Sequence, residues 1–508
     1  MTHPTDLHEL MAAGAAPAIA LSAPGRAALS FGALRKQLDY TVAGLNRLGI
    51  GRNDRVALVM PNGPDMASAF IAVAAGATAA PLNPAYGAEE FNFYLTDLGA
   101  KALIVERGST SPAVAVAHKL GLCVSEIEAE PCAGAFRLIA ADGGTGVNTP
   151  ALSGFALADE IALALHTSGT TSRPKIVPLS QRNICASATN IRTVLELGPD
   201  DRGLNIMPLF HIHGLMASVL APLAAGGSVF CTPGFNALKF FCWMEESRPT
   251  WYTAVPTMHQ TILSRAERNR AIIDTQPLRF IRSSSSALPA PVIQQLETAF
   301  GAPVLESYGM TEAAHQMTSN PLPPRERRPG TVGIAAGPEV AIMDRDGVLL
   351  PPGTSGEIVI RGGNVTAGYE NNRKANTEAF ANGWFHTGDL GSMSADGYLS
   401  LTGRLKEIIN RGGEKISPRE VDDVLLEHPA VHQAVTFAVP HDKLGEDVAA
   451  AIVLHDGADA TEKELREFVA NRLVEFKVPR KILILEEIPK GATGKLQRIG
   501  LAEKLGLA

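Results

Sequence analysis

The sequence has few cysteines, no excess of basic residues and no long hydrophobic run, and each absence excludes a class of protein. Its 508 residues include only five cysteines, and their spacing fits neither a zinc site nor a disulfide framework. We therefore expect them to be small buried apolar side chains in a reducing compartment. The formal net charge of −7 provides no basic footprint, so neither nucleic acid nor an anionic membrane is expected as a partner.

Targeting and membrane-spanning signals are also missing. The N-terminal stretch MTHPTDLHEL carries acidic residues and no apolar core, unlike a secretory signal. The most apolar segment, residues 66–82, is rich in alanine and glycine and too short to cross a bilayer comfortably. The last residues, KLGLA, do not match the peroxisomal tripeptide. These features predict a cytoplasmic protein and leave its oligomeric state open.

What is present predicts an α/β enzyme with more than one domain. Hydrophobic residues make up 45% and charged residues 19%, which is typical of a globular protein, and the chain is longer than one core usually supports. Strand-like runs at 55–60, 161–165, 228–231 and 304–306 alternate with longer helix-compatible stretches. From about residue 337, short alternating segments around glycines predict a β-rich subdomain at 337–403, which ends a large N-terminal domain at 1–403.

The remaining residues, 404–508, predict a small α+β domain. Ser417 and Thr461 are each followed three residues later by a glutamate, Glu420 and Glu464, which predicts two helices with capping boxes. Strand-like segments lie between and after these helices: AVTFAVP, AAAIVL and KILILEEIP.

One loop has an unusual composition. Residues 159–180 read DEIALALHTSGTTSRPKIVPLS, an apolar strand that ends in small hydroxyl residues and glycine before Arg173 and Lys175. Such a loop offers backbone N–H groups and hydroxyls to an anion, and Lys175 adds a positive charge, so phosphate is the expected ligand. The loop is not a Walker A motif, because no Gly-Lys-Ser/Thr triplet closes it. An ordinary surface turn remains an alternative for the loop alone.

Five segments stand in order along nearly the whole chain: HTSGTTSRPK, ESYGMTE, WFHTGDLG, GRLKEIINRGGEK and PKGATGK. In order and spacing they resemble the signature motifs of the adenylate-forming superfamily, which comprises acyl-CoA synthetases, luciferases and peptide-synthetase adenylation domains. Further segments resemble its oxalate–CoA ligase branch: PLFHIHGL, TWYTAVPTMHQ, RFIRSSSSALPAPV, TEAAHQMTSNPLP and NRGGEKISP. One departure is Ile176, where these loops usually carry glycine. Because a branched side chain disfavours a positive φ, the end of the loop is expected to differ slightly.

The resemblance implies a two-step reaction. A carboxylate attacks the α-phosphorus of ATP and releases pyrophosphate, and the acyl group then passes from the adenylate to the thiol of coenzyme A. Mg²⁺ is required in this scheme. The resemblance assigns Glu312 to the metal and the Thr311 hydroxyl to the α-phosphate. A carboxylate that only satisfies the start of a helix is the alternative for Glu312. The residues expected to hold the β- and γ-phosphates are Thr167, Ser168, Gly169, Thr170, Thr171 and Lys175.

The same resemblance implies a nucleoside site. The ring of Tyr308 would stack on adenine, and Ser307 would line that pocket. Asp389 would accept both ribose hydroxyls and Arg404 would donate to the same sugar. A solvated aspartate after a glycine turn is the alternative for Asp389, and the Trp384–Phe385 pair before it argues for a buried approach instead.

The C-terminal domain is implied to be mobile. Lys495 matches the adenylation lysine, which bridges the attacking carboxylate and the α-phosphate. Lys406 occupies the hinge position, and rotation there would withdraw the lysine so that coenzyme A can enter. Gly412 and Gly413 would then line the pantetheine channel, and Lys415 would contact phosphate in one conformation. An ordinary tight turn is the alternative for the two glycines.

The acid pocket has three candidate residues. A small dicarboxylate brings a second charge that needs donors, which favours His211, Ser285 and His315, with His211 also a catalytic candidate. His315 is expected nearly one helical turn from Glu312 if a helix begins there. His213 is expected to be a core histidine that bonds to backbone.

Oxalate is the expected acid. Malonyl-CoA synthetases usually carry arginine where ESYGMTE has Ser307, which argues against malonate. Medium-chain or aryl acids, loading of a carrier protein, a non-catalytic nucleotide sensor and luciferase-like oxygenation remain alternatives.

Overall fold

The computed structural model describes residues 4–140, 149–167, 174–489 and 497–508. By its internal contacts the chain divides into two units. Among the described residues, the first unit comprises 4–140, 149–167, 174–340 and 360–383, and the second comprises 341–359, 384–489 and 497–508. The predicted α/β class is confirmed. The division at residue 404 stays a prediction.

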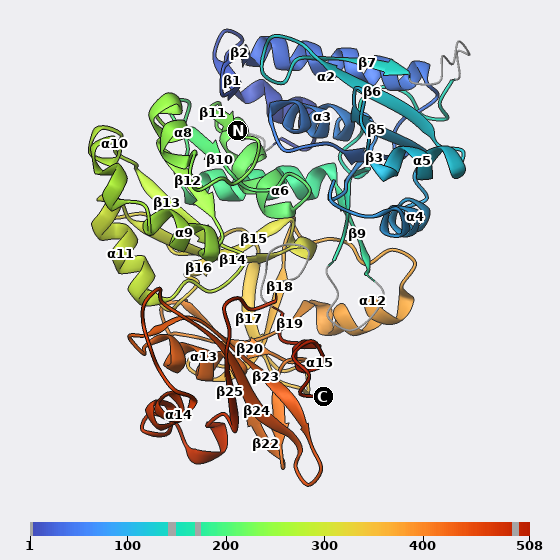
Figure 1. The fold of residues 1–508 in the computed structure, drawn as a ribbon. Coiled ribbons are helices and arrows are strands. Elements are labelled where there is room, and N and C mark those ends of the chain that lie inside the picture. The colour runs from blue at the N-terminus through green and yellow to red at the C-terminus, as the bar shows by residue number, and fades with distance from the viewer. Residues whose placement is uncertain (1–3, 141–148, 168–173, 490–496) are drawn as a thin grey trace. The chain divides into compact units, whose positions relative to one another are not determined.

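The first unit contains a nine-stranded sheet (Figure 1). Its central strands are parallel, and strands at both ends pair antiparallel. The predicted strand at 228–231 matches β11 at both ends, whereas the strand that starts at Val304 continues to Met310. In spatial order the strands are β16 (Ile334–Ala335), β15 (His315–Ser319), β14 (Val304–Met310), β13 (Phe280–Ser284), β12 (Trp251–Ala254), β10 (Arg202–Asn205), β11 (Ser228–Cys231), β1 (Ile19–Ala23) and β2 (Arg26–Ser30).

A seven-stranded sheet also lies in this unit. Its inner strands read as near-continuous apolar runs, such as ALIV at residues 102–105, because both of their faces are buried. In spatial order they are β7 (Phe136–Ala140), β6 (Cys123–Ala129), β5 (Ala102–Glu106), β3 (Arg55–Val59), β4 (Thr78–Pro81), β8 (Ile161–His166) and β9 (Ile176–Ser180).

Three helices contact strands of both sheets: α2 (Phe31–Arg47), which contacts β1, β2 and β7, and two others. The first of these two is α3 (Pro64–Ala74), which contacts β1 and β11 of the larger sheet and β3 and β4 of the smaller one. Nearly every residue of α3 is buried, which explains the apolar run at 66–82 as a core helix followed by a strand. The second is α6 (Gln181–Val194), which contacts β15 as well as β8 and β9. These helices therefore form a layer shared by the two sheets.

The other helices of this unit are shorter than α2, which lies beside α3 (Figure 1). They are α1 (Leu7–Leu10), α4 (Ala88–Asp97), α5 (Pro112–Lys119), the π-helix η2 (Gly214–Leu220), α7 (Ala221–Ala224), α8 (Phe240–Ser247), α9 (Pro256–Leu263), α10 (Arg270–Thr275), α11 (Ala290–Phe300) and α12 (Arg373–Ala379). Four 3₁₀ turns join them: η1 (Met11–Ala13), η3 (Glu267–Asn269), η4 (Thr311–Ala313) and η5 (Ala381–Gly383).

The strands expected at 337–403 form a four-stranded sheet, which lies mostly in the second unit. Its order is β17 (Glu339–Met343), β18 (Ser355–Arg361), β19 (Phe385–Met393) and β20 (Leu399–Arg404). The alternating segments of the sequence therefore predicted β structure correctly.

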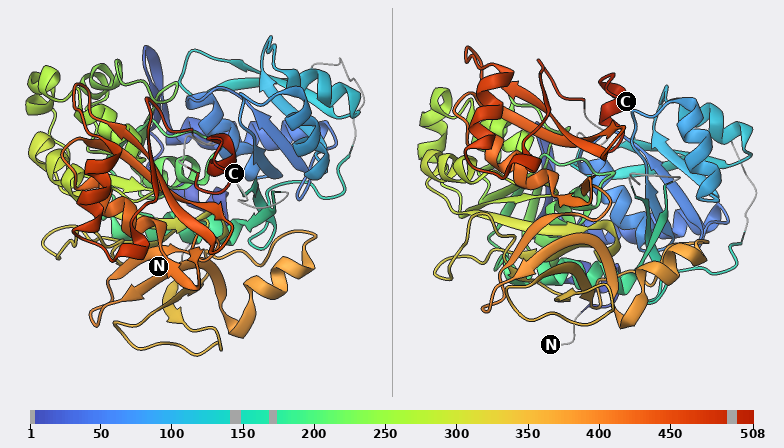
Figure 2. Two further views of the ribbon diagram at one scale, coloured as in Figure 1. Left: turned by 60° about the horizontal axis from the view of Figure 1, so that its bottom comes forward. Right: turned by 90° about the horizontal axis from the view of Figure 1, so that it is seen from below.

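The rest of the second unit is a five-stranded sheet with helices, as expected for an α+β domain. Its long hairpin β23–β24 is drawn in orange in Figure 2. The strands are β22 (Glu414–Ile416), β21 (Ile409–Arg411), β24 (Gly445–Leu454), β23 (Val431–His441) and β25 (Lys481–Ile484). The helices are α13 (Pro418–Leu426), α14 (Glu462–Ala470), η6 (Glu475–Lys477) and α15 (Leu501–Lys504). An apolar cluster that includes Val421, Leu425 and Leu465 gives this part its own core.

Two sequence expectations need correction. Ser417 precedes α13, but its hydroxyl bonds to the carbonyl of Thr402 and makes no helix cap, so the predicted capping box is wrong there. The cysteines are also not uniformly buried: Cys185 and Cys231 are, whereas Cys242 is exposed, because the exposed side of α8 carries it. Within the described residues, no helix is long and apolar enough to cross a membrane.

Candidate active site

The strand before the predicted phosphate loop pairs with the strand after it. β8 and β9 are antiparallel, with His166 opposite Ile176. Beyond that pair, the N–H of Thr167 donates to the carbonyl of Lys175 at 2.9 Å. Thr167 and Lys175 therefore lie opposite each other. The other predicted loop residues, Ser168, Gly169, Thr170 and Thr171, lie outside the described residues.

Ile176, the departure from the usual glycine, is the first residue of β9. Its side chain is 6% exposed and packs in the apolar cluster around Leu103 and Phe91. A branched side chain suits an extended, buried strand position. The departure therefore has a structural reason: in this chain the residue after Lys175 is already part of the sheet.

Lys175 and Glu312 are linked by a residue that the sequence did not indicate. The ammonium group of Lys175 lies 4.3 Å from the ring centroid of Tyr369, which is a cation–π distance. The Tyr369 hydroxyl donates to Oε1 of Glu312 at 2.8 Å. Glu312 is buried in the 3₁₀ turn η4, beside Thr311. The structure thus brings two of the predicted ATP-binding residues together through Tyr369. A tyrosine in the segment NVTAGYE carries no distinguishing pattern by itself.

His315 does not lie on a helix with Glu312. The turn η4 ends at Ala313, and His315 begins β15, which pairs antiparallel with β14. A bulge between Tyr308 and Gly309 lets the two strands approach so closely that a Cβ at Gly309 would meet the carbonyl oxygen of His315 at 1.5 Å. Only glycine fits there, which explains the glycine of ESYGMTE.

The predicted acid-pocket residues Ser285 and His315 meet through His213. The His213 ring stacks on the His315 ring with centroids 4.7 Å apart. Nδ1 of His213 lies 3.0 Å from the Ser285 hydroxyl, and Nε2 lies 2.7 Å from the hydroxyl of Thr253. His213 is buried, as expected, but these partners are side chains and not the expected backbone groups. His211 lies next to this cluster: its Nδ1 accepts from the backbone N–H of His213 at 3.4 Å.

Arg282 contacts the imidazoles of His213 and His315 and was not predicted from the sequence. It lies on β13 and is 0% exposed. Burial lowers the pKa of Arg282 to about 9, which leaves it cationic at neutral pH. The signal in the sequence that could have predicted this role is an arginine within a strand-like run, since a charged residue is rarely buried in a strand.

Ser307 and Tyr308 lie in succession on β14. The Ser307 hydroxyl is 3.0 Å from the hydroxyl of Ser319 on β15, and its carbonyl accepts from Ser284. Tyr308 is 9% exposed. Thr311, which follows on η4, is half-buried.

Asp389 and Arg404 form an ion pair in the second unit. They are cross-strand neighbours on β19 and β20, and Nε of Arg404 lies 2.7 Å from Oδ1 of Asp389. Asp389 is 5% exposed, in agreement with the buried approach expected from Trp384 and Phe385. The family resemblance placed both residues at one sugar, and the structure does place them together.

The predicted hinge and channel residues lie on two turns. Lys406 is exposed in the turn between β20 and β21. Gly412 and Gly413 join β21 to β22 with φ values of +60° and +100°, as a two-residue hairpin of consecutive glycines requires. Lys415 is exposed on β22. Lys495 lies outside the described residues.

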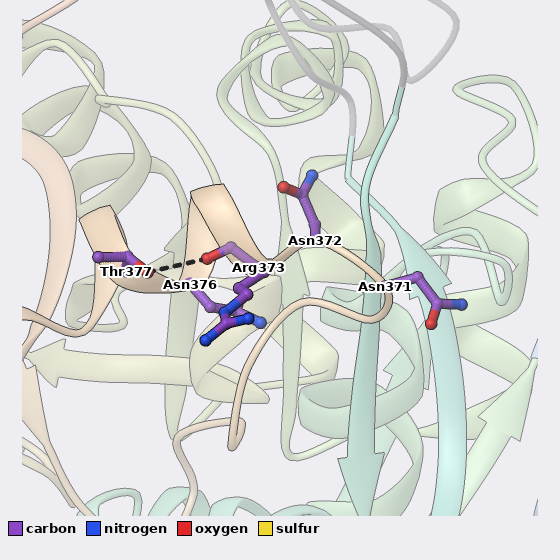
Figure 3. Close-up of a pocket in the computed structure, with 5 residues that line it drawn as sticks. All are labelled: Asn371, Asn372, Arg373, Asn376 and Thr377. Carbon is purple, nitrogen blue, oxygen red and sulfur yellow. Dashed lines mark hydrogen bonds between the residues drawn. The ribbon is translucent and has the colours of Figure 1, made fainter.

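An open hollow of about 660 Å³ lies in the first unit, at the start of α12. Its lining residues are Asn371, Asn372, Arg373, Asn376 and Thr377, none of which was predicted from the sequence (Figure 3). The side chains do not converge, since Asn371 and Thr377 lie at opposite ends of the segment. The part of the chain that the structure describes also holds no group of three His, Cys, Asp or Glu side chains suited to a metal ion.

Known proteins are similar to this chain in sequence and in fold. The AMP-binding enzyme family matches residues 10–370, and the AMP-binding enzyme C-terminal domain matches residues 420–495. The chain is 46% identical to oxalate–CoA ligase of Arabidopsis thaliana, over 94% of each chain. It is 44% identical to oxalate–CoA ligase of Saccharomyces cerevisiae, over 89% of this chain and 87% of the other.

Among solved structures, the fold resembles ATP-bound MatB from Rhodopseudomonas palustris, with a TM-score of 0.88, 28% identity and 99% of each chain covered. The predicted superfamily is therefore confirmed. The chain belongs to the AMP-binding enzyme family and, within it, to the acid–thiol ligases.

Proposed function

We propose that the protein joins oxalate to coenzyme A. Oxalate and ATP form oxalyl-adenylate and pyrophosphate, and the thiol of coenzyme A then displaces AMP to give oxalyl-CoA. The observation that carries this proposal is the polar cluster of Ser285, His213 and His315. Its members include two of the three residues that the sequence assigned to an acid with a second charge.

The chemistry of this cluster favours a dicarboxylate over a fatty acid. A buried carboxylate without donors costs several kcal/mol, so a pocket for oxalate must provide hydrogen-bond donors. The imidazoles and the Ser285 hydroxyl can meet that need, and the buried Arg282 cation beside them offsets negative charge. A fatty-acid ligase would instead line its pocket with apolar side chains. The full-length similarity to two oxalate–CoA ligases supports the same substrate.

For the first step, we propose that Thr167 and Lys175, with Ser168, Gly169, Thr170 and Thr171, hold the phosphates of ATP. Thr311 contacts the α-phosphate in this proposal. Tyr369 fixes the Glu312 carboxylate by its hydrogen bond and lies against the Lys175 ammonium group, so it positions both. Lys495 stabilises the charge that develops as the carboxylate attacks, and His211 assists at the acid.

Mg²⁺ fits the donor set at Glu312. A magnesium ion usually binds one or two protein carboxylates and completes its shell with water and substrate phosphates, so a dedicated cluster of acids is not needed. Glu312 supplies a buried carboxylate beside the Thr311 hydroxyl, and its orientation is fixed by Tyr369. When bound, Mg²⁺ neutralises charge on the phosphate oxygens.

For the nucleoside, we propose that Tyr308 stacks on adenine beside Ser307, and that the paired Asp389 and Arg404 bind the ribose hydroxyls. The short distance between Asp389 and Arg404 supports a shared sugar ligand. For coenzyme A, we propose that Gly412 and Gly413 line the pantetheine channel, that Lys415 contacts phosphate and that Lys406 is the hinge. The mobility of residues 404–508 as a domain is part of this proposal, as is a cytoplasmic location.

Pyrophosphate release tests the assignment. We expect release with ATP, Mg²⁺ and oxalate, increased by coenzyme A, and little with malonate, acetate, hexanoate or coumarate. Coenzyme A is added last to separate adenylate formation from thiol transfer. Release with malonate or hexanoate but not with oxalate would overturn the choice of acid. Release with oxalate that coenzyme A leaves unchanged would overturn the choice of thiol acceptor.

A further inference from the structure

Arg282 is a buried cation whose partners are neutral. It lies on β13, between β12 and β14 in the sheet (Figure 1). One terminal nitrogen lies 3.3 Å from both Thr253 Oγ1 and His213 Nε2, and the other lies 3.1 Å from His315 Nε2 and 3.2 Å from Gln316 Oε1. Nε has no hydrogen-bond partner among the described residues, and within them no carboxylate forms an ion pair with the guanidinium.

The direction of each hydrogen bond follows from the guanidinium, because it can only donate. Nε2 of His213 and Nε2 of His315 are therefore acceptors, so each neutral ring carries its proton on Nδ1. The hydroxyl of Thr253 accepts from Arg282 and donates to His213 Nε2. Nδ1–H of His213 then donates to Ser285 Oγ. Because Ser285 accepts this bond, its own proton is left to donate to a ligand.

A buried charge without a counter-charge is costly, so its presence needs a reason. Desolvation by burial lowers the pKa of Arg282, and within the described residues no carboxylate forms an ion pair with it. An anion bound beside the imidazoles and Ser285 would supply that missing charge. Oxalate carries two negative charges, and only one of its carboxylates reacts with ATP.

The backbone at this cluster is strained as well. Ser285, Ala314 and His315 have φ values of +76°, +46° and +95°, a region that residues other than glycine rarely adopt. Such strain is retained where the surrounding structure holds a residue in place at a functional site. Two of the three residues, Ser285 and His315, hydrogen-bond to His213 and to Arg282 respectively.

We propose that Arg282 is a positioning residue that sets the specificity of the pocket for an acid with a second negative charge. Through Thr253 and His213 it leaves the proton of the Ser285 hydroxyl able to donate to the acid. By donating to Nε2 of His315 it keeps the proton of that ring on Nδ1, where it can also donate. It does not itself touch the substrate. The inference rests on the proposed function, because it takes oxalate as the acid.

The test compares oxalate with glyoxylate, in which an aldehyde replaces one carboxylate. In Arg282→Met we expect the KM for oxalate to rise at least tenfold and the KM for ATP to stay within twofold. The preference for oxalate over glyoxylate should fall at least tenfold. If glyoxylate is not turned over, its inhibition constant against oxalate replaces its KM. Arg202→Met is the control, because Arg202 on β10 bonds to Ser247 and lies outside the cluster.

A second pair of variants keeps the test valid if Arg282→Met does not fold. Thr253→Val removes the hydroxyl that links Arg282 to His213 and keeps the shape of the side chain, whereas Thr253→Ser keeps the hydroxyl. We expect the first to raise the KM for oxalate about fivefold and the second to stay near wild type. Circular dichroism and a thermal melt check folding of every variant.

The outcomes separate this inference from the proposed function. Wild-type protein that releases no pyrophosphate with oxalate would overturn the proposed function. Suppose that the wild type uses oxalate, and that Arg282→Met or Thr253→Val folds and keeps the wild-type KM and preference for oxalate. That result would overturn the role of Arg282 alone. An equal rise in the KM for ATP would also overturn it, because a general loss of structure would then explain the effect.

Discussion

Buried histidines in this protein are neutral for two different reasons. His213 accepts from a cation at Nε2, as described above. His259, on α9, instead donates from Nε2 to the carbonyl of Arg282 and accepts at Nδ1 from the hydroxyl of Tyr252, both at 3.2 Å. Burial lowers the pKa of His259 to about 4. Its contacts need the neutral ring, so protonation of His259 works against the folded state.

This arrangement predicts acid sensitivity between about pH 6.5 and pH 4. In that interval the unfolded chain binds a proton at His259 and the folded chain does not, so stability falls as the pH falls. The contribution amounts to about 3 kcal/mol when the whole interval is crossed. Urea denaturation of His259→Gln at pH 7, 6 and 5 should therefore show a shallower loss of stability than wild type.

The control for this prediction is His118→Gln, since His118 is exposed on α5. It should follow the wild-type dependence on pH. If His259→Gln loses stability with the same slope as wild type, the burial of His259 is not a source of the acid sensitivity.

Residues of the site differ in how well the sequence predicted them. Ser285 and His315 were predicted because an acid with a second charge needs polar donors, and the structure does bring them into one cluster. Arg282 and Thr253 were missed because their roles depend on cross-strand neighbours, and Tyr369 was missed because its partner Glu312 lies far away in the chain. A sequence motif cannot show which strand lies next to which.

At the scale of helices and strands, the same sequence pattern gave two different results. Thr461 caps α14, accepting from the N–H of Glu464, whose carboxylate bonds back to the Thr461 N–H at 2.7 Å. Ser417 and Glu420 have the same spacing before α13. There the serine bonds to Thr402 and the glutamate forms an ion pair with Lys477, so tertiary partners replace the local box. Capping motifs therefore predict where a helix starts better than they predict the contacts of its first turn.

Thr461→Ala is expected to destabilise the second unit by about 1 kcal/mol, because α14 loses its N-cap. A double-mutant cycle measures whether the side chains of Thr461 and Glu464 stabilise the start of α14 together. Thr461→Ala and Glu464→Ala each remove the bond from the Thr461 hydroxyl to the Glu464 carboxylate at 2.8 Å, so the double variant should be less destabilised than the sum of the two single variants. Chemical denaturation of the four proteins provides the values.

The matched control is the cycle of Ser417→Ala and Glu420→Ala, whose side chains have separate partners. Their effects should simply add. Coupling at Ser417 and Glu420, or its absence at Thr461 and Glu464, would contradict the structural assignment of the boxes.

Strands were predicted more reliably than caps, for a physical reason. The inner strands β3, β8 and β11 are apolar along most of their length because sheets and helices bury both faces. Burial therefore leaves a signal in consecutive residues. The order of strands in the two large sheets leaves no such signal, and it came from the structure alone.

On the scale of the whole molecule, the proposed reaction requires the protein to perform two chemically distinct steps. Adenylate formation moves negative charge onto the α-phosphate and the leaving pyrophosphate, whereas thiol transfer releases AMP as the leaving group. A cation that assists the first step is not needed in the second. The proposed roles of Lys495 and Lys406 depend on this difference, and mutation can separate the steps.

Lys495→Ala should impair the first step far more than the second. Removing one preorganised donor from a developing charge typically lowers the rate by about two to three orders of magnitude. Oxalate-dependent pyrophosphate release should fall by that amount, whereas transfer of the oxalyl group to coenzyme A from supplied oxalyl-adenylate should stay within a few-fold of wild type. Lys504→Ala, an equal change of charge at an exposed position on α15, should leave both rates unchanged. Equal losses in both half-reactions would instead mean that Lys495 maintains the structure or binds the nucleotide throughout, and the assignment of a single step to it would be wrong.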